Sequence, residues 1–322
     1  MSSSESPESI SIAVSIAVLV PCYNEEKTIA NVVRDFRQAL PSARIYVYDN
    51  NSRDATQKLA AQAGAEVRSE PLQGKGWVVR RMFADIEADV YVLVDGDDTY
   101  EAGKAPAMVE LLRSQHLAMV VGRRVHEAAE AYRPGHVLGN KLFTGAVARL
   151  FGTSFSDILS GYRVFSRPFV KSFPVFAGGF EIETELTVHA LTLKLPVAEV
   201  ATIYKERPAG SLSKLSTYRD GIRILWMILL LFKNEKPFQF FSILAAVFLL
   251  AALILAYPVV VTFLATGLVP RFPTAILSTG LALYSLIMLA CGLILDTVSK
   301  GRQEAKLLSY LQVGKTASKA TG

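Results

Sequence analysis

Three aspartates follow one short apolar segment of the chain. Asp95, Asp97 and Asp98 come directly after the run Val90–Val94, interrupted only by Gly96. If this run is a buried strand, its end delivers carboxylate oxygens to the carboxyl edge of a sheet. Open α/β sheets bind ligands at that edge, and a divalent cation held there can bind a diphosphate. An Asp-Gly-Asp segment also occurs as a plain turn before a helix, so the interpretation depends on the rest of the chain.

Polar residues also follow two other strand-like runs. The run Ile16–Val20 leads into Pro21–Glu26, and the run Arg44–Tyr48 leads into Asp49–Asp54. A helix cap or an Asx turn would explain either segment by itself. If the strands are parallel, however, the three polar ends converge on one crevice and supply acceptors for a base and a ribose beside the cation.

A glycine-flanked lysine lies between these strand ends, in the segment Gln73–Gly76. Glycine permits close approach of the backbone, and Lys75 is placed to meet a phosphate. Lys75 is followed by Gly76 rather than by Ser or Thr, so the segment is not a Walker loop and a P-loop ATPase is excluded.

The amino-terminal part alternates between strand-like and helix-like patterns, which predicts an α/β fold with crossover helices between parallel strands. The predicted strands are Ile16–Val20, Arg44–Tyr48, Ala65–Arg68, Val90–Val94, Met119–Val121 and Val197–Tyr204. The predicted helices are Thr28–Leu40, Ala55–Ala63, Val78–Ile86, Leu138–Phe151 and Glu181–Lys194. We expect a basic loop at Gly122–Gly135 and interpret Glu181 and Glu183 as a buried or helix-starting pair without a chemical role.

Two long apolar segments occupy the carboxyl-terminal third. Neither Pro237–Pro270 nor Thr274–Leu295 contains a charged residue, and hydrophobic residues make up 51% of the whole chain. Each segment exceeds the roughly 20 residues that cross about 30 Å of hydrocarbon, so we predict two transmembrane helices. The alternative is a buried hairpin in a large soluble core.

Basic residues flank this pair of spans on one side. The basic residue in the connection between the spans is Arg271. The outer flanks contain more basic residues: Arg219, Arg223, Lys233, Lys236, Lys300, Arg302 and Lys306. The positive-inside rule therefore predicts that both termini and the amino-terminal domain are cytoplasmic. The net charge of +5 is too dispersed to indicate a nucleic-acid groove and instead suits a surface that rests on anionic lipid. The two cysteines, Cys22 and Cys291, indicate no disulfide framework.

A cluster of basic side chains follows the fifth predicted strand, and it suits recognition of a phosphate monoester. Its members are Arg123, Arg124, His126, Arg133 and Lys141. A solvated basic face is the alternative. The neighbouring stripe of Leu138–Phe151 predicts an amphipathic helix that packs on the sheet or lies in the membrane interface, and Tyr218–Lys233 is the stronger interfacial candidate.

These motifs, in this order and spacing, resemble family 2 glycosyltransferases of the GT-A fold, a Rossmann-like α/β fold. The resemblance rests on Pro-x-Tyr-Asn-Glu-Glu, Asp-Asn-Asn-Ser-x-Asp, Gly-Lys-Gly and Asp-Gly-Asp-Asp, and it covers roughly Ile16 to Lys214. Within that family, the sequence most resembles the polyprenyl-phosphate glycosyltransferase group, which includes dolichol-phosphate mannose synthase and bacterial undecaprenyl-phosphate sugar transferases. Two carboxyl-terminal spans are a common variant in that group.

The resemblance implies roles for individual residues. Asp95 and Asp97 would act through Mg²⁺ or Mn²⁺ on the donor diphosphate, and Asp157, in Asp-x-x-Ser-Gly-aromatic-Arg, would lie near the reacting centre. The residues implied in nucleotide-sugar binding, with a UDP-sugar favoured, are Pro21, Tyr23, Glu25, Asp49, Lys75, Asp95, Gly96, Arg163 and Lys214. The basic cluster after the fifth predicted strand, and not the resemblance, is the ground for assigning Arg123, Arg124 and Lys141 to the acceptor phosphate. Thr99 stands where some relatives carry a metal-binding glutamine, which leaves the third protein ligand open.

The expected activity is an inverting transfer of a sugar from a nucleotide-diphosphate sugar to a polyprenyl phosphate at the cytoplasmic side of a bilayer, the inner or plasma membrane. Association into a homo-oligomer is left open. The expected segments are a disordered tail (1–15), a catalytic domain (16–216), an interfacial helix (217–236), two spans (237–269 and 274–296) joined by a turn (270–273), and a cytoplasmic tail (297–322).

Two rival functions are considered. A processive polysaccharide synthase shares the donor motifs, but it should carry Gln-x-x-Arg-Trp, and here Gly76 stands in the place of the arginine before Trp77. Such synthases also have more spans. A non-enzymatic membrane adaptor or a transporter is the other alternative. Transporters usually carry polar or charged groups within the membrane, and these spans contain no charged residue before Asp296.

Overall fold

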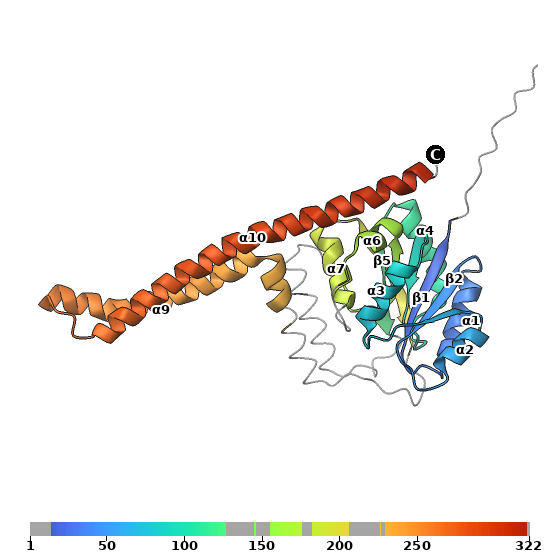
Figure 1. Cartoon of the computed structure of the whole chain (residues 1–322), viewed down its shortest axis with the longest axis horizontal. Helices are drawn as coiled ribbons and strands as arrows, with labels where there is room; N and C mark the ends of the chain where they lie inside the picture. The colour runs from blue at the N-terminus through green and yellow to red at the C-terminus, as the bar shows by residue number, and fades with distance from the viewer. Residues whose placement is uncertain are drawn as a thin grey trace, which may run out of the picture. The chain divides into compact units, whose positions relative to one another are not determined.

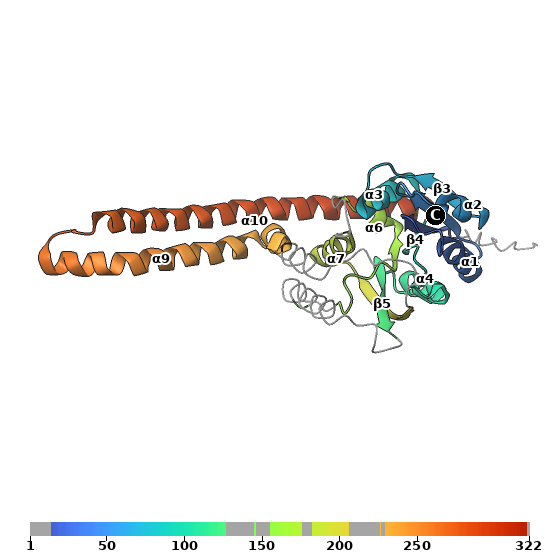
Figure 2. The same ribbon diagram turned by 90° about the horizontal axis from the view of Figure 1, so that it is seen from below.

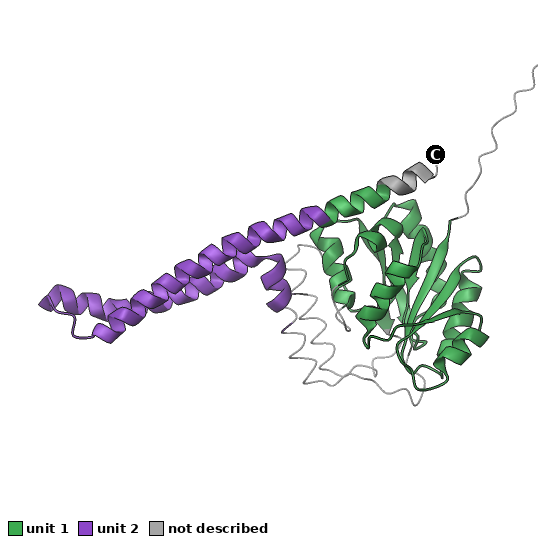
Figure 3. Ribbon diagram, viewed as in Figure 1, with its two compact units in different colours: residues 1–144, 153–215, 306–322 green, residues 145–152, 216–305 purple. Residues whose placement is uncertain are grey.

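The computed structural model describes residues 14–126, 145, 155–175, 182–205, 226 and 229–320, and no side chain beyond residue 314 is described. It divides into two units, which Figure 3 distinguishes by colour. Unit 1 consists of residues 1–144, 153–215 and 306–322, and unit 2 of residues 145–152 and 216–305.

Unit 1 contains a sheet of seven strands in the order β3-β2-β1-β4-β6-β5-β7 (Figure 1). The strands are β1 (Ile16–Cys22), β2 (Arg44–Asp49), β3 (Glu66–Ser69), β4 (Val90–Leu93), β5 (Met119–His126), β6 (Arg163–Ser166) and β7 (Val197–Tyr204). Strand β6 is antiparallel to both of its neighbours, β4 and β5, and the other pairings are parallel. The carboxyl ends of the parallel strands and the amino end of β6 therefore meet at one edge, which we call the carboxyl edge.

Helices cover both faces of the sheet, as Figures 1 and 2 show. They are α1 (Ile29–Ala39), α2 (Thr56–Gln62), α3 (Lys75–Asp85), the short 3₁₀ helix η1 (Ala102–Lys104), α4 (Ala105–Ser114), α6 (Arg167–Ser172) and α7 (Ile182–Thr192). The core between the sheet and α1 and α4 is made of alternate strand residues such as Val18, Val20, Val92 and Val164, all at most 3% exposed. This alternation arises because successive side chains of a strand point to opposite faces.

The structure confirms the predicted α/β sheet and the six predicted strands, with shifts at their ends, and it adds β6. Strand β5 extends to His126, so Arg123 and Arg124 lie in a strand rather than in the expected loop. Helix α7 falls within the predicted Glu181–Lys194. The predicted helix Leu138–Phe151, Lys141, Lys214 and most of the expected interfacial helix lie outside the described residues.

Unit 2 contains an antiparallel hairpin of two long helices, α9 (Pro237–Thr266) and α10 (Phe272–Ala320), and the second continues into unit 1. Both helices are long and apolar enough to cross a membrane. Gly292 lets the two backbones approach, since a Cβ there would come within 2.9 Å of Cβ of Phe241. The Ser285 hydroxyl donates to the carbonyl of Ala245 at 2.8 Å, as expected for helix packing in lipid.

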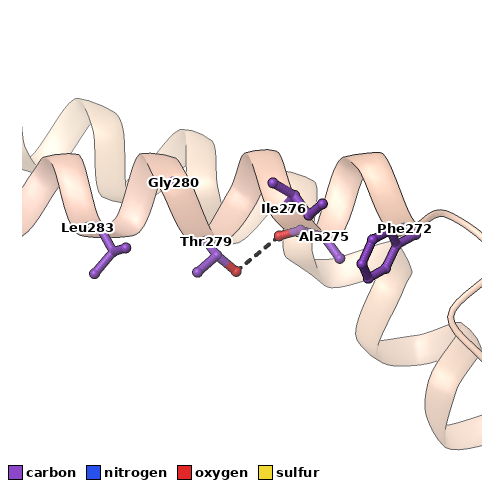
Figure 4. Close-up of a pocket in the computed structure, with 6 residues that line it drawn as sticks. All are labelled: Phe272, Ala275, Ile276, Thr279, Gly280 and Leu283. Carbon is purple, nitrogen blue, oxygen red and sulfur yellow. Dashed lines mark hydrogen bonds between the residues drawn. The ribbon is translucent and has the colours of Figure 1, made fainter.

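The second helix continues beyond the expected span. Helix α10 is unbroken from residue 272 to 320, so the segment that we expected as a cytoplasmic tail is helical. A shallow apolar hollow lies near the start of α10 (Figure 4). Thr279 is the polar side chain among the residues that line it, and its hydroxyl donates to Ala275 of the same helix. This hollow therefore offers no chemistry comparable with that of the carboxyl edge.

Candidate functional site

Asp49 ends strand β2 as a fully buried carboxylate. Its Oδ2 accepts hydrogen bonds from the backbone N–H of Ser52 at 3.0 Å and from Nε2 of Gln57 at 2.8 Å. Its Oδ1 is also buried and meets no hydrogen-bond donor among the residues that the structure describes. A buried acceptor without a donor costs free energy. Oδ1 of Asp49 is therefore suited to a donor on a ligand, such as a ribose hydroxyl or a base N–H.

The loop after β1 is tied to the loop after β2. The backbone N–H of Asn24 donates to Oγ of Ser52 at 2.8 Å, and Oδ1 of Asn24 accepts from the backbone N–H of Arg53 at 2.8 Å. The backbone N–H of Glu25 donates to Oγ1 of Thr56 at 2.8 Å. Asn24 therefore does not cap α1; it holds the two loops together and adopts a left-handed φ of 54° to do so.

The side chain of Asn50 positions the glycine-flanked lysine. Its Nδ2 donates to the carbonyls of Glu70 and Leu72 at 2.9 and 2.7 Å, and its Oδ1 accepts from the backbone N–H of Gly74 at 2.7 Å. Gly74 has a φ of 137°, a conformation that only glycine adopts readily. This arrangement starts α3 at Lys75 beside the carboxyl edge.

The Lys75 ammonium lies between two carboxylates. It donates to Oδ1 of Asp95 and to Oε1 of Glu183, the latter at 2.5 Å. Burial by itself would lower the pKa of Lys75, but the two carboxylates raise the pKa well above its ordinary value. The lysine is therefore charged, and it joins the ends of three elements: β4, α3 and α7.

Asp97 and Gly96 are each held by the hydroxyl of a threonine. Oδ1 of Asp97 accepts from the hydroxyl of Thr99 at 2.6 Å, so Thr99 orients this carboxylate. The carbonyl of Gly96 accepts from Oγ1 of Thr28 at 2.7 Å. A Cβ at Gly96 would come within 2.5 Å of Sγ of Cys22. Glycine is thus required here for packing of the loop.

Asp157 forms a buried ion pair with Arg124. Nε and Nη2 of Arg124 donate to the two carboxylate oxygens at 2.7 Å each, and its backbone N–H adds a bond at 3.1 Å. Burial raises the pKa of Asp157, but the bonds from Arg124 outweigh it and hold the pKa below its ordinary value. Asp157 is therefore ionised at neutral pH.

The segment that contains Asp157 packs against the loop that contains Asp95. A Cβ at Gly161 would overlap the carboxylate of Asp95. The backbone N–H of Gly161 donates to the hydroxyl of Tyr100 at 2.9 Å, and Oγ of Ser160 donates to the carbonyl of Gly122 at 2.6 Å. These contacts follow from β6, which starts directly after this segment and runs antiparallel to β4. They bring carboxylates from distant parts of the sequence to one edge.

The sequence and fold comparisons agree with this geometry. Residues 17–173 match the family model for glycosyl transferase family 2. Glycosyltransferase AglJ of Haloferax volcanii is 33% identical over 308 residues, which cover 92% of this chain and 98% of that protein. The chain belongs to glycosyl transferase family 2.

Two further relatives support the same placement. A dolichyl-phosphate hexose transferase of Haloferax volcanii is 28% identical over 209 residues, which cover 65% of this chain and 90% of that protein. The crystal structure of M. tuberculosis glucosyl-3-phosphoglycerate synthase matches with a TM-score of 0.54 and 25% identity, and it covers 67% of this chain and 80% of that one. The amino-terminal domain of this family 2 glycosyltransferase therefore has the GT-A fold.

Of the expected nucleotide-binding residues, four lie at or beyond the ends of β1 and β2 and one is buried within the domain. Pro21, Tyr23, Glu25 and Asp49 lie at or just beyond the ends of β1 and β2, as predicted, and the first three are partly exposed. Arg163 differs from the expectation. Its side chain is fully buried and donates to the carbonyls of Ser160 and Ile158 and to Oγ1 of Thr187. In this glycosyltransferase Arg163 holds the backbone of the segment that contains Asp157, and its side chain is not exposed to bind a nucleotide sugar.

The expected basic cluster is divided by the strand. Arg123 and Arg124 are successive residues of β5, so their side chains leave opposite faces of the sheet. Arg124 extends toward Asp157 and stacks on the ring of Tyr204, with 5.4 Å between the guanidinium carbon and the ring centroid. The two arginines therefore do not form the single patch that the sequence suggested.

The carboxylates of Asp95 and Asp97 fit a hard divalent cation. The side chain of Asp95 is 29% exposed, and Asp97 is oriented by Thr99. Within residues 14–126, 155–175 and 182–205, no three His, Cys, Asp or Glu side chains gather closely enough to enclose an ion. A cation there would take its remaining ligands from water and substrate phosphate, which is the usual coordination of Mg²⁺.

The sequence did not predict two contacts at the carboxyl edge. Glu183 was interpreted as a buried or helix-starting acid without a chemical role, and it is both buried and in the first turn of α7. Its contact with Lys75 was not expected, nor was the hydrogen bond from the backbone of Gly161 to Tyr100. A Glu within an apolar helix was the available signal for Glu183, since a buried carboxylate requires a partner. No local pattern marked Tyr100.

Proposed function

We propose that the protein transfers a sugar from a nucleoside-diphosphate sugar, with a UDP-sugar favoured, to a polyprenyl phosphate with inversion at the anomeric carbon. The observation that carries the proposal is the placement of Asp49, Asp95 and Asp157, from three separate segments of the chain, at one carboxyl edge of the sheet. A chain with two helices able to cross a membrane has a means of reaching a lipid acceptor. The family membership and the dolichyl-phosphate hexose transferase relative support this acceptor class.

The donor would lie along the ends of β1, β2 and β4. Asp49 offers a buried acceptor to the nucleoside, and Tyr23 and Glu25 border the same loops. Asp95 and Asp97 would hold Mg²⁺ or Mn²⁺, and the ion, when bound, would neutralise negative charge on the nucleoside diphosphate. Lys75 and Lys214 are the basic residues proposed for the donor side.

The acceptor requires little activation. A phosphate monoester has its second pKa near 6, so it is already largely dianionic at neutral pH and needs no strong general base. Asp157 remains ionised because Arg124 is bound to it. We assign to Asp157 the orientation of the acceptor or the stabilisation of positive charge that develops on the sugar ring. Arg124 then contributes to the acceptor site by fixing Asp157, with Arg123 and Lys141 as further candidates for the phosphate.

The membrane arrangement is part of the proposal. Helices α9 and α10 cross the bilayer, with Arg271 in the connection and the more numerous basic residues at the two outer flanks. The positive-inside rule then places both termini and the catalytic domain in the cytoplasm. A cytosolic nucleotide sugar and a lipid phosphate at the membrane surface are both available on that side.

The test is a transfer assay with the full-length chain purified in detergent. A panel of radiolabelled nucleotide sugars is incubated with a polyprenyl phosphate and Mn²⁺, and the organic phase is counted. We expect label in the organic phase for one or a few donors, and the Asp95→Asn variant serves as the negative control. A water-soluble polymer would indicate the polysaccharide synthase alternative instead. Absence of transfer from every donor, with nucleotide binding also absent, would support an adaptor.

A further inference from the structure

A lysine, rather than a second acid, faces Asp95 inside the site. The side chains of Lys75 and Glu183 are only 10% and 7% exposed, whereas that of Asp95 is 29% exposed. Two carboxylates that approach each other in a low-dielectric environment repel unless a cation lies between them. Lys75 is that cation, and it contacts both.

The three partners differ in how firmly they are placed. Glu183 is buried in the first turn of α7, and its backbone carbonyl accepts from Oγ1 of Thr187 at 3.0 Å. Lys75 starts α3 under the control of Asn50 and Gly74. Asp95 is the most exposed of the three and is the one expected to hold a divalent cation. The Lys75–Asp95 contact is therefore the contact that ligand binding would replace.

We propose that Lys75 is an exchangeable counter-ion of the cation site and that Glu183 is the positioning residue that retains it. Asp95 exchanges the Lys75 ammonium for the divalent cation, and Lys75 stays bound to Glu183. An ammonium has three N–H donors, so Lys75 then has donors to offer to the diphosphate. This inference rests on the proposed role of Asp95 in metal binding. It explains how Glu183 and Asp95 both keep a positively charged partner before the cation and donor arrive.

The sharpest test removes one positive and one negative charge together. The Lys75→Met/Glu183→Gln variant has the same net charge as the wild type, but nothing competes with the cation for Asp95. Binding of Mn²⁺ alone to the full-length chain in detergent is measured by electron paramagnetic resonance of the free ion. We expect the dissociation constant of the double variant to fall by about tenfold, which corresponds to roughly 1.4 kcal/mol. Glu183→Gln alone should weaken binding, because Lys75 is then left with Asp95 as its carboxylate partner.

Control variants separate counter-ion exchange from a general effect of charge or folding. Lys58→Met removes an exposed lysine of α2 in the same domain and should leave Mn²⁺ binding unchanged. Asp95→Asn should abolish the binding. If Asp95→Asn binds Mn²⁺ as the wild type does, the proposed metal role fails. If Asp95→Asn abolishes binding but the double variant binds no more tightly than the wild type, the exchange is refuted while the metal role stands.

A second measurement tests whether Lys75 exchanges its contact with Asp95 for a contact with the diphosphate. With Mn²⁺ at saturation, UDP should bind several-fold more weakly to Lys75→Met than to the wild type, while Mn²⁺ alone binds more tightly to the same variant. Opposite signs for the two ligands are expected only if Lys75 leaves Asp95 for the diphosphate. Weaker binding of both ligands would indicate a purely structural lysine and would overturn the proposal. If Lys75→Met does not fold, the charge-neutral double variant provides both measurements.

Discussion

The ion pair between Arg124 and Asp157 allows a quantitative prediction. In the variant Arg124→Gln, the carboxylate of Asp157 loses two charge-assisted hydrogen bonds of 2.7 Å each, although the backbone bond from residue 124 at 3.1 Å remains. The side chains are 23% and 6% exposed, so Asp157 would be left buried and largely unpaired. Removal of one partner of a buried pair costs about 3–5 kcal/mol. The partial exposure of Arg124 favours the lower end of that range.

The expected loss is measurable as a change in melting temperature. A loss of about 3 kcal/mol corresponds to a decrease of roughly 6–12 °C for a domain of about 200 residues. Thermal unfolding of the full-length chain in detergent, followed by intrinsic fluorescence, measures this decrease. Arg123→Gln is the matched control, because its side chain leaves the opposite face of β5. The double variant Arg124→Gln/Asp157→Asn should recover most of the lost stability, since no unpaired carboxylate remains.

The pH dependence follows from the sign of the pKa shift. Arg124 lowers the pKa of Asp157 in the folded protein, so the pair contributes its full stability above the unfolded carboxyl pKa of about 3.9. That contribution is lost as the pH falls through the lower folded value. The difference in melting temperature between wild type and Arg124→Gln should therefore be largest near neutral pH and should narrow in acid. Equal melting temperatures for Arg124→Gln and Arg123→Gln, with no recovery in the double variant, would refute the reasoning.

The other predictions concern catalysis. Asp95→Asn and Asp97→Asn should each abolish sugar transfer with the fold retained, because a neutral amide is a poorer ligand for a hard cation; full transfer in chelator-treated buffer would contradict this. Asp157→Asn should decrease kcat more than donor affinity, and unchanged kcat with weaker donor binding would reassign the residue to the donor pocket. Gly161→Ala should lower kcat because its Cβ overlaps Asp95, and normal kinetics would show that the loop adjusts freely. Asp49→Asn should weaken UDP binding in calorimetry, whereas intact binding would place the nucleoside elsewhere.

The sequence alone predicted much of the sheet and three of the loops at its edge. Parallel strands such as β1, β2 and β4 are buried on both faces, so they appear as short apolar runs that end in polar residues. The convergence of these ends at one edge follows from parallel pairing. The apolar runs and their polar ends are therefore sufficient to place Asp49, Asp95 and Asp97 on the same side of the domain.

Strand β6 was not predicted, because four residues, Arg163–Ser166, are too short for an alternating pattern and two of them are polar. Its antiparallel insertion between β4 and β5 is a tertiary event, and it carries the Asp157 segment to Asp95. The extension of β5 through Arg124 is likewise fixed by pairing with β7, at Arg124 opposite Thr202.

For the charged residues of the site, too, the sequence predicted one part and tertiary packing decided the other. The residue types at Lys75, Asp95 and Asp157 were readable as chemistry from the sequence. Their partners were not, since Lys75 lies 108 positions before Glu183 and Arg124 lies 33 positions before Asp157. Local sequence determines which side chains a strand or turn can present. Which buried charge neutralises which depends on the packing of distant elements, because a buried carboxylate must find its partner in space rather than along the chain.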